Sequence, residues 1–523
     1  MENGIKQNKN TDRLVILLLA ASAVFLTFLT CPFSPIYRYN FEPDEICYQI
    51  MSLGWLKGKI PYRDLFDHKG PLTYVIYSLG LLLTGKNTLG ILFVFSAINI
   101  GSFILVYKTM RLCFPENKSI VGTTLILSLF FAAKYPLFAS GTKPDHFILL
   151  FLLISEYLYV RGIKEYRKKI NALSSSETEK KESSKQKVSP VVFGKRDRFL
   201  IGLCCGAVFM IKMNVCIYFL TFIGFYFLWL LYKKEGKAFF WSCGLFLSGI
   251  VLVCLPFFIY YSLNGALSDL IYAYFTFNIK YAGKGGIHLF LSRPYIEMHN
   301  QYTIVLLFVV LAGASLCYYL SGKNDKTQRL VTLLCGAPVY AMIAFPETFA
   351  YTFVLLLPLY LWGTAIFSDL LVSFLPEKIT RIAPVVMAVF IVGNFAIYQL
   401  LLLPSIPKEK PEYETAMETY YESHPDATCL YFTNLCHGFH YSYSSALPDF
   451  RFFFMPREGT SDMYAAQIDY VRKGIPDVIA FFRTPDVDEA FMEKMDTFFS
   501  EGGYHLYFDD FDDSQYYIYV RNE

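Results

Sequence analysis

Long apolar runs, separated by short charged segments, fill most of this 523-residue chain. Several of them, such as 89–110 and 238–263, reach the ~20 residues that an α-helix needs to cross a hydrocarbon core about 30 Å thick. The apolar pattern predicts eleven transmembrane helices, at residues 14–31, 88–110, 119–133, 147–160, 199–211, 215–232, 238–262, 302–320, 330–345, 350–368 and 382–403.

The apolar run 72–84 does not fit this series. As a helix of about thirteen residues it covers only about 20 Å. If it crossed the membrane, every later loop would change sides. The basic segment 161–198 would then lie outside, whereas basic loops are usually retained in the cytoplasm. We therefore expect this run to form a juxtamembrane helix on the outer surface.

The pattern changes after Pro404. Short β-rich runs at 428–433, 477–482 and 516–520 alternate with helical patterns at 412–422 and 488–499. Such alternation predicts a small α/β domain. The stretch 174–184 is rich in Ser, Glu and Lys without an apolar period, which predicts a disordered linker.

Composition and charge support a membrane protein and orient it. The chain is 54% apolar and 17% charged, whereas soluble domains carry roughly 25% charged residues. Residues 161–198 hold twelve Lys or Arg against five Asp or Glu, and residues 404–523 hold nine against twenty-two. Because basic loops are retained in the cytoplasm, 161–198 is predicted to lie inside, and the acidic tail outside.

The predicted fold class is an α-helical polytopic membrane protein with outer juxtamembrane helices and a small C-terminal extracytoplasmic α/β domain. We expect it in the plasma membrane of a bacterium, with 14–31 kept as a span and not removed as a signal peptide. The tail cysteines Cys429 and Cys436 are either bridged or free. The expected domains are a cytoplasmic N-terminus (1–13), a membrane domain (14–403, with outer loops 32–87 and 263–301 and the cytoplasmic linker 161–198) and an extracytoplasmic domain (404–523).

The segment 41–71 concentrates charge between two apolar runs. It contains five carboxylates, one histidine and four basic side chains, a density that membrane insertion does not require. Asp44 and Glu45 follow Pro43 and open a short helix at the membrane surface. A carboxylate there can act as a general base, although Asp and Glu also favour helix N-termini for stability alone.

His68 and Lys69 precede Gly70 and Pro71, where the surface helix begins. A lysine at a helix N-terminus opposes the helix dipole, but it suits an anion held there by free backbone N–H groups. The alternative is a lysine that reaches the lipid headgroups. Tyr62 and Arg63 of the same segment are further candidate substrate contacts.

Other charged residues lie at predicted outer ends of spans. Asp145 opens the fourth span, and Lys212 interrupts an apolar run, which is costly unless it faces a polar cavity. Arg293, with neighbouring lysines in the 263–301 loop, suits either an anionic ligand or lipid headgroups. Acidic side chains can activate a hydroxyl group, and basic side chains can hold a phosphate leaving group. Activated nucleotides are scarce outside the cytoplasm, so a phosphate-bearing donor would have to arrive through the membrane. A polyprenyl-phosphate sugar meets this condition and is the expected donor.

Four motifs in this order resemble the GT-C superfamily of membrane glycosyltransferases. They are FEPDE, PYRDLFDHKGP, YVIYSLGLLLTG and KPDHFILLF. The resemblance covers roughly residues 10–400. It is closest to the group that contains protein O-mannosyltransferases and the aminoarabinose transferases of lipid A, and it implies a GT-C-like membrane domain.

The resemblance also implies an inverting, one-step displacement at the anomeric carbon of a polyprenyl-phosphate-linked sugar. By position, Asp44 matches the base that activates the acceptor, Lys69 the lysine that contacts the donor phosphate, and Asp145 the acid opening the fourth span. His68 replaces an acid that helps to bind metal in some members. Metal dependence therefore stays open, with His68 and Glu45 as the candidate ligands of a divalent ion.

The expected function is transfer of a sugar to an acceptor hydroxyl of a protein, lipid or cell-envelope polymer, with no nucleic-acid partner. Two other classes stay open. A transporter or flippase of lipid-linked sugars would place its polar residues near the membrane midplane, whereas here they gather at one surface. A non-catalytic envelope assembly protein would depend on residues 404–523 and not on Asp44.

Overall fold

The computed structural model divides the chain into two compact units. The helical unit comprises Met1–Thr30, Phe95–Phe257 and Ala282–Leu403, and the loop–sheet unit comprises Cys31–Val94, Phe258–Tyr281 and Pro404–Glu523. The structure describes residues 9–37, 43–85, 87–114, 142–179, 191–282, 409–436, 440–457, 459–483, 489–510 and 516–522, with a few single positions between 119 and 127 and between 382 and 393.

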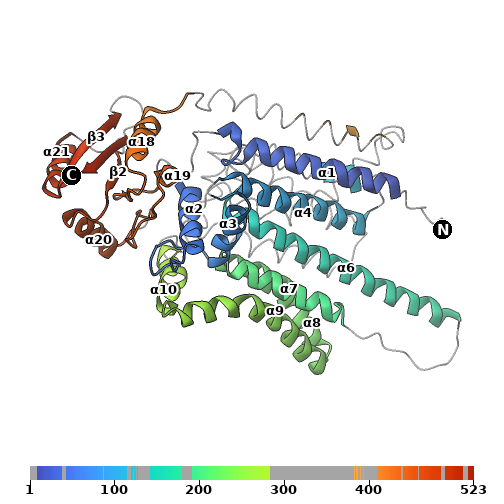
Figure 1. Ribbon diagram of the computed structural model, residues 1–523. Coiled ribbons are helices and arrows are strands. Elements are labelled where there is room, and N and C mark those ends of the chain that lie inside the picture. The colour runs from blue at the N-terminus through green and yellow to red at the C-terminus, as the bar shows by residue number, and fades with distance from the viewer. Residues whose placement is uncertain are drawn as a thin grey trace. The chain divides into compact units, whose positions relative to one another are not determined.

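Apolar helices make up the described part of the helical unit (Figure 1). Within the described residues, four helices are long and apolar enough to cross a membrane, at Thr11–Leu29, Leu89–Leu112, Pro144–Ile170 and Gly236–Leu263. The helices are α1 (Lys9–Thr30), α4 (Leu89–Cys113), α6 (Pro144–Glu179), α7 (Lys195–Phe209), α8 (Ile217–Tyr232) and α9 (Gly236–Leu263), with the 3-10 turn η2 (Met213–Cys216) before α8.

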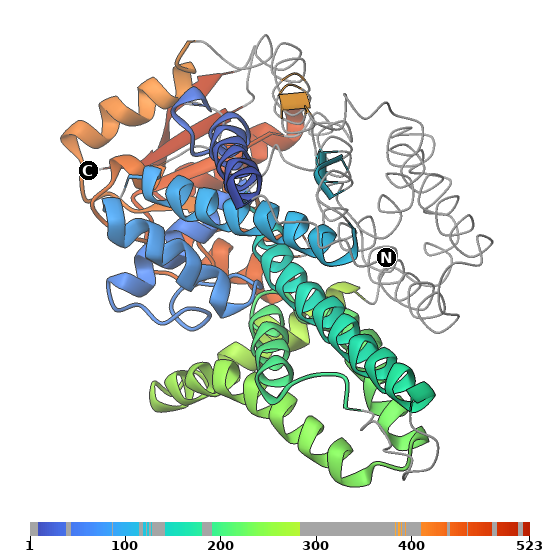
Figure 2. The same ribbon diagram turned by 90° about the vertical axis from the view of Figure 1, so that its right-hand side faces the viewer.

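Figure 2 shows the helices of this unit from the side, and a few specific side-chain contacts join neighbouring helices. The Asn99 amide of α4 donates a 2.9 Å hydrogen bond to Thr27 Oγ1 of α1. The ring centroids of Phe95 in α4 and Phe147 in α6 are 4.8 Å apart. Small residues let α7 and α9 approach closely, because a Cβ added to Gly249 would lie 2.4 Å from a carbonyl oxygen of α7. Close approach at glycine is a common way to pack helices in membranes.

Comparison with the predicted spans gives confirmations and one correction. The runs 14–31, 88–110 and 238–262 are long helices, as expected. The prediction of a disordered linker at 174–184 is wrong for residues 174–179, because α6 continues through Glu179. Once a helix exists, each further residue adds a backbone hydrogen bond, and no Gly or Pro interrupts residues 164–179. The predicted spans at 119–133, 302–320, 330–345, 350–368 and 382–403 lie largely outside the described residues.

The loop–sheet unit begins with two short helices that pack together. They are α2 (Pro43–Leu56) and α3 (Pro71–Thr84), preceded by the 3-10 turn η1 (Pro35–Tyr37). Ser52 of α2 donates a 3.0 Å hydrogen bond to the Tyr74 carbonyl of α3. The Tyr48 and Tyr77 rings stack edge to face 5.5 Å apart. The predicted short helix at 72–84 is therefore confirmed as a helix. The same unit contains α10 (Leu267–Leu270), the π-helix η3 (Ile271–Thr276) and α11 (Phe277–Ala282).

A four-stranded sheet lies in the C-terminal part of this unit. Its order is β1-β2-β4-β3, with β1 parallel to β2 and the other two pairs antiparallel. The strands are β1 (Cys429–Tyr431), β2 (Val478–Phe482), β3 (Tyr504–Asp510) and β4 (Tyr516–Arg521). The helices are α18 (Glu412–Ser423), α19 (His440–Tyr443), α20 (Ser461–Arg472) and α21 (Glu489–Glu501).

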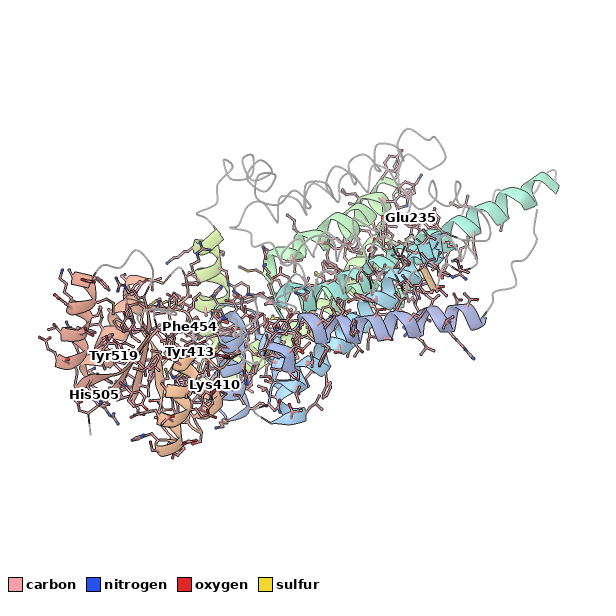
Figure 3. All side chains as sticks on the ribbon, turned by 90° about the horizontal axis from the view of Figure 1, so that it is seen from above. Glu235, Lys410, Tyr413, Phe454, His505 and Tyr519 are labelled. Atoms are coloured by element: carbon pink, nitrogen blue, oxygen red, sulfur yellow. The ribbon has the colours of Figure 1, made fainter. Side chains whose placement is uncertain are left out.

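Alternation along β4 assigns helices to opposite faces of the sheet (Figure 3). Tyr519 lies on one face, where its ring is 4.5 Å from Phe499 of α21. Tyr516 lies on the other face, where its ring is 4.7 Å from Tyr413 of α18. Because successive strand residues point to opposite faces, this aromatic strand can fill both layers of the core.

Gly249 tests the close packing of α7 and α9. We expect Gly249→Ala to destabilise the protein by about 1–3 kcal/mol, because the added methyl group overpacks the contact. Gly244 of the same helix has nothing within 4 Å of an added Cβ, so Gly244→Ala is the matched control, with an expected effect of about 0.5 kcal/mol or less. Thermal unfolding in detergent measures both variants, and equal melting temperatures would contradict this packing.

His440 makes the stability of the C-terminal part depend on pH. Burial lowers the pKa of His440 to about 3, and its Nε2 atom lies 2.7 Å from the Tyr516 hydroxyl oxygen. Below about pH 6.5 the unfolded chain binds a proton at this histidine that the folded chain does not bind. Stability should therefore fall as pH falls, by about 2 kcal/mol at pH 5 from this group. Thermal unfolding at pH 7.5 and pH 5 should show a smaller pH effect in His440→Gln, and an equal effect would contradict the assignment.

Candidate active site

The connection between α2 and α3 folds back on itself within residues 57–70. The Tyr62 amide donates a 2.7 Å hydrogen bond to the Leu65 carbonyl. Tyr62 has a φ of 72°, which is uncommon for a residue with a side chain and implies that the surroundings hold it there. Its buried hydroxyl donates a 2.6 Å hydrogen bond to the Lys69 carbonyl. Tyr62 thus fixes the backbone immediately before α3.

Asp67 is the buried acid of this segment, and only 2% of it is exposed. The Tyr74 hydroxyl donates to its Oδ2 atom over 2.8 Å, and the His68 amide donates to its Oδ1 atom over 2.7 Å. Burial raises the pKa of Asp67, but the contacts with His68 and the charge of Lys69 outweigh it and leave the pKa below its ordinary value. Asp67 is therefore an ionised, fully held carboxylate.

His68 and Lys69 form a pair next to that carboxylate. The Lys69 ammonium group donates a 2.9 Å hydrogen bond to His68 Nε2, while His68 Nδ1 lies 3.3 Å from Asp67 Oδ1. Burial lowers the pKa of His68 and the charge of Lys69 lowers it further, against the opposing effect of Asp67. A neutral imidazole between an anion and a cation explains this arrangement. We call Asp67, His68 and Lys69 the charged triplet.

The charged triplet lies at the N-terminus of α3. Gly70 is the N-cap residue of this helix and Pro71 is its first residue. The N-terminus of a helix favours anions, because free N–H groups and the helix dipole point there. The side-chain amide of Asn278 in α11 donates a 2.6 Å hydrogen bond to the backbone carbonyl of His68. The predicted placement of Lys69 and His68 at a helix start is therefore confirmed.

Asp44 and Glu45 lie in the first turn of α2. Asp44 is half-buried, whereas only 1% of Glu45 is exposed. The charge of Asp44 acts on the pKa of His68, raising it against the dominant effect of burial. Both helix starts of this unit thus contribute charged groups to one region.

Arg63, a candidate substrate contact, binds protein groups in the structure. Its guanidinium forms a 2.8 Å ion pair with Asp64 and donates a 2.9 Å hydrogen bond to the Asn264 carbonyl. Arg293, the other arginine named as a candidate, lies outside the described residues. Among the described residues, His, Cys, Asp and Glu form no group of three or more that could hold a metal ion.

Asp145 and Lys212 form an ion pair within the helical unit. Lys212 Nζ lies 2.9 Å from Asp145 Oδ1, and the carboxylate is buried. Asp145 is in the first turn of α6, and Lys212 lies between α7 and η2 in extended conformation. The two residues are 67 positions apart, and their pairing was not predicted from the sequence. The lysine that interrupts an apolar run has its counter-ion here.

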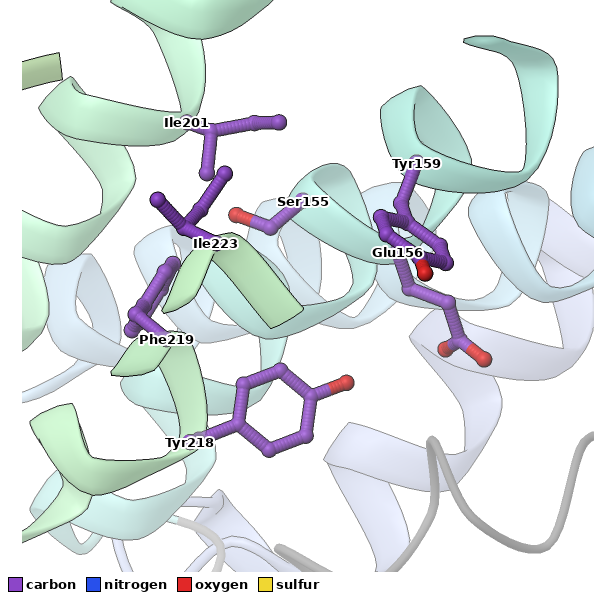
Figure 4. Close-up of a pocket in the computed structure, with 7 residues that line it drawn as sticks. All are labelled: Ser155, Glu156, Tyr159, Ile201, Tyr218, Phe219 and Ile223. Atoms are coloured by element: carbon purple, nitrogen blue, oxygen red, sulfur yellow. The ribbon is translucent and has the colours of Figure 1, made fainter. Parts of the chain in front are cut away.

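The helical unit also contains a small cavity with a buried acid (Figure 4). It has a volume of about 10 Å³, about the size of one water molecule. Its lining comprises Ser155, Glu156 and Tyr159 of α6, Ile201 of α7, and Tyr218, Phe219 and Ile223 of α8. Glu156 was not singled out from the sequence, because a single acid in a long helical pattern gives no signal.

Sequence reasoning also missed Asp67 as a functional candidate. The available signal was its position directly before His68 and Lys69 at a helix start. Its importance comes from burial and from the Tyr74 hydroxyl, and the sequence gives no indication of either.

The ion pair in the helical unit can be tested through stability. Lys212→Met should destabilise the protein by about 1–3 kcal/mol, because it leaves the Asp145 carboxylate buried without its cation. The double variant Asp145→Asn with Lys212→Met should recover part of this loss. Chemical unfolding in detergent measures both. If Lys212→Met unfolds like the wild type, the pair does not stabilise the fold.

Comparisons with known proteins show similarity in sequence over one segment and in fold over most of the chain. A family model described as dolichyl-phosphate-mannose-protein mannosyltransferase matches residues 68–174. The fold is similar to that of ArnT from Cupriavidus metallidurans, solved with bound undecaprenyl phosphate, at 11% sequence identity and a TM-score of 0.61, covering 97% of each chain. It is also similar to the apo form of an oligosaccharyltransferase from Archaeoglobus fulgidus, at 10% identity and a TM-score of 0.52, covering 90% of this chain and 70% of that one. No curated protein matches the sequence.

The family match begins at His68 and includes Lys69 and Asp145, so it contains part of the charged triplet and the acid that opens α6. The similarity to ArnT extends over almost the whole chain. The predicted resemblance is confirmed: the fold is similar to that of ArnT, and residues 68–174 are similar to the dolichyl-phosphate-mannose-protein mannosyltransferase family.

Proposed function

We propose that this protein is a membrane glycosyltransferase that moves a sugar from a polyprenyl-phosphate-linked donor to an acceptor hydroxyl group on the outer face of the membrane. The observation that carries the proposal is the charged triplet at the N-terminus of α3, where Lys69 presents a cation at the positive end of the helix dipole. This combination suits a phosphate group. The ArnT structure, which has the same fold, holds undecaprenyl phosphate.

Lys69 is proposed to hold the donor phosphate, with Asp67 and His68 fixing its position. Because His68 is neutral, it accepts the Lys69 hydrogen bond without adding a competing charge. As the bond between the anomeric carbon and the phosphate oxygen breaks, the phosphate gains negative charge. A cation already in place stabilises that charge without reorganising.

Asp44 is proposed to act as the general base. The acceptor oxygen forms a bond to the anomeric carbon, its proton passes to the Asp44 carboxylate, and the polyprenyl phosphate leaves with the electron pair. One displacement of this kind inverts the anomeric configuration. Asp44 is half-buried, so part of its surface is open to an acceptor.

The remaining candidates have supporting roles in this proposal. Glu45 and Asp145 are further candidate acids, and Lys212, which is paired with Asp145, is a further candidate substrate contact. Tyr62 positions the Lys69 backbone. Arg63 and Arg293 are proposed to contact the substrate. The proposed topology has eleven spans, with a cytoplasmic N-terminus and residues 404–523 outside as an α/β domain.

Transfer of labelled sugar in liposomes tests the proposal. Purified protein, a labelled polyprenyl-phosphate sugar and cell-envelope material as acceptor should yield labelled product. Asp44→Asn should lower the rate by about 10²–10⁴-fold, because the acceptor proton then has no base. Lys69→Ala should lower it by about 10²–10³-fold, because the leaving phosphate loses its cation.

Lys473→Ala is the control, since Lys473 forms an exposed ion pair with Asp469 within α20. It should transfer sugar at the wild-type rate. Undiminished transfer by Asp44→Asn and Lys69→Ala would exclude these two roles. Absence of transfer by the wild type with every polyprenyl-phosphate donor would contradict the proposed function.

A further inference from the structure

The C-terminal part of the chain contacts the α2–α3 connection at several points in the loop–sheet unit. The Lys57 ammonium group donates a 2.9 Å hydrogen bond to the Ser445 carbonyl, and Lys59 forms a 2.7 Å ion pair with Asp449. The Cys436 thiol lies within hydrogen-bond reach of Cys47 in α2. Residues 445–451 therefore lie along the connection, and Cys436 lies against α2.

Arg451 makes the most extensive of these contacts. Its carbonyl oxygen accepts a 2.8 Å hydrogen bond from the Phe66 amide. Its guanidinium forms a 3.0 Å ion pair with Asp269 of α10 and lies 5.7 Å from the centre of the Phe66 ring. It also lies 5.3 Å from the Phe452 ring. A guanidinium can stack on aromatic rings and bind a carboxylate at the same time, which an ammonium group does less well.

Phe66 is the residue immediately before the charged triplet, and none of its surface is exposed. Its ring packs against Phe452 at 5.3 Å, Phe277 at 5.6 Å and Tyr272 at 6.2 Å. Since Phe66 and Asp67 are adjacent, any shift of the Phe66 backbone moves the Asp67 carboxylate, and with it His68 and Lys69. Contacts of Arg451 with Phe66 therefore restrain the position of the charged triplet, which begins at the next residue.

We propose that Arg451 is a positioning residue for phosphate recognition: it fixes Phe66 against α10 and so holds Lys69 where a polyprenyl phosphate binds. The C-terminal part then completes the site without contributing a group to the reaction. This inference rests on the proposed function for its ligand. The holding of the Phe66–Lys69 segment is measurable without any substrate.

The Lys59–Asp449 pair provides a matched control. It also joins the C-terminal part to the connection, but the Asp449 side chain is 79% exposed. An exposed ion pair contributes little to stability. Asp449→Asn therefore removes a contact between the same two segments, only two residues from Arg451, without touching Phe66.

The experiment combines hydrogen exchange and ligand binding on the full chain in detergent. In Arg451→Gln, the amides of residues 66–69 should exchange about tenfold faster than in the wild type. The dissociation constant for undecaprenyl phosphate should rise about tenfold. Arg451→Lys keeps the charge near Asp269 but stacks less well on the two rings, so it should fall between Arg451→Gln and the wild type. Asp449→Asn should match the wild type in both measurements.

Each outcome decides one claim. Unchanged exchange at residues 66–69 in Arg451→Gln, or an equal change in Asp449→Asn, would overturn the positioning role. Faster exchange with unchanged phosphate affinity would overturn its link to recognition. If Arg451→Gln does not fold, Arg451→Lys and Asp269→Asn carry the same comparison. If the wild type binds no undecaprenyl phosphate while exchange responds as expected, the proposed donor is wrong, and the holding of the loop stands.

Discussion

A buried carboxylate needs hydrogen-bond donors and a nearby cation, and Asp67 obtains them from residues that the proposed site also uses. Tyr74, one turn into α3, and the His68 amide supply donors to the two carboxylate oxygens. The cation is Lys69, which reaches this region through the neutral imidazole of His68. Within the charged triplet, Lys69 bonds to His68 and His68 lies against Asp67. The orientation of Lys69 therefore depends on the buried position of Asp67.

Two other segments of the loop–sheet unit hold the backbone of this cluster. Asn278 of α11 binds the His68 carbonyl, and Arg451 from the C-terminal part binds the Phe66 amide. Tyr62, in its strained conformation, adds a third support at the Lys69 carbonyl. A short loop supported from three sides can keep a flexible lysine in place, and preorganised charge stabilises a phosphate leaving group.

Local signals in the sequence predicted a large part of this structure. The strands at 428–433, 477–482 and 516–520 were found because their runs are β-branched or aromatic and are bounded by turn residues. β3 was missed, since its second half is acidic and a register shift interrupts its alternation between Leu506 and Phe508. Among the candidate residues, Lys69 and Asp145 carry motif and helix-start signals. Asp67 and Arg451 do not, because their roles come from contacts between residues distant in sequence, such as Arg451 with Asp269.

The central claim is that Lys69, at the N-terminus of α3, binds the phosphate of a polyprenyl-phosphate donor. A cryo-electron microscopy structure of the protein with bound undecaprenyl phosphate tests it most directly. We expect a phosphate oxygen within hydrogen-bond distance of Lys69 Nζ, beside an intact Asp67–His68 contact. A phosphate bound elsewhere, with Lys69 still turned only toward His68, would contradict it.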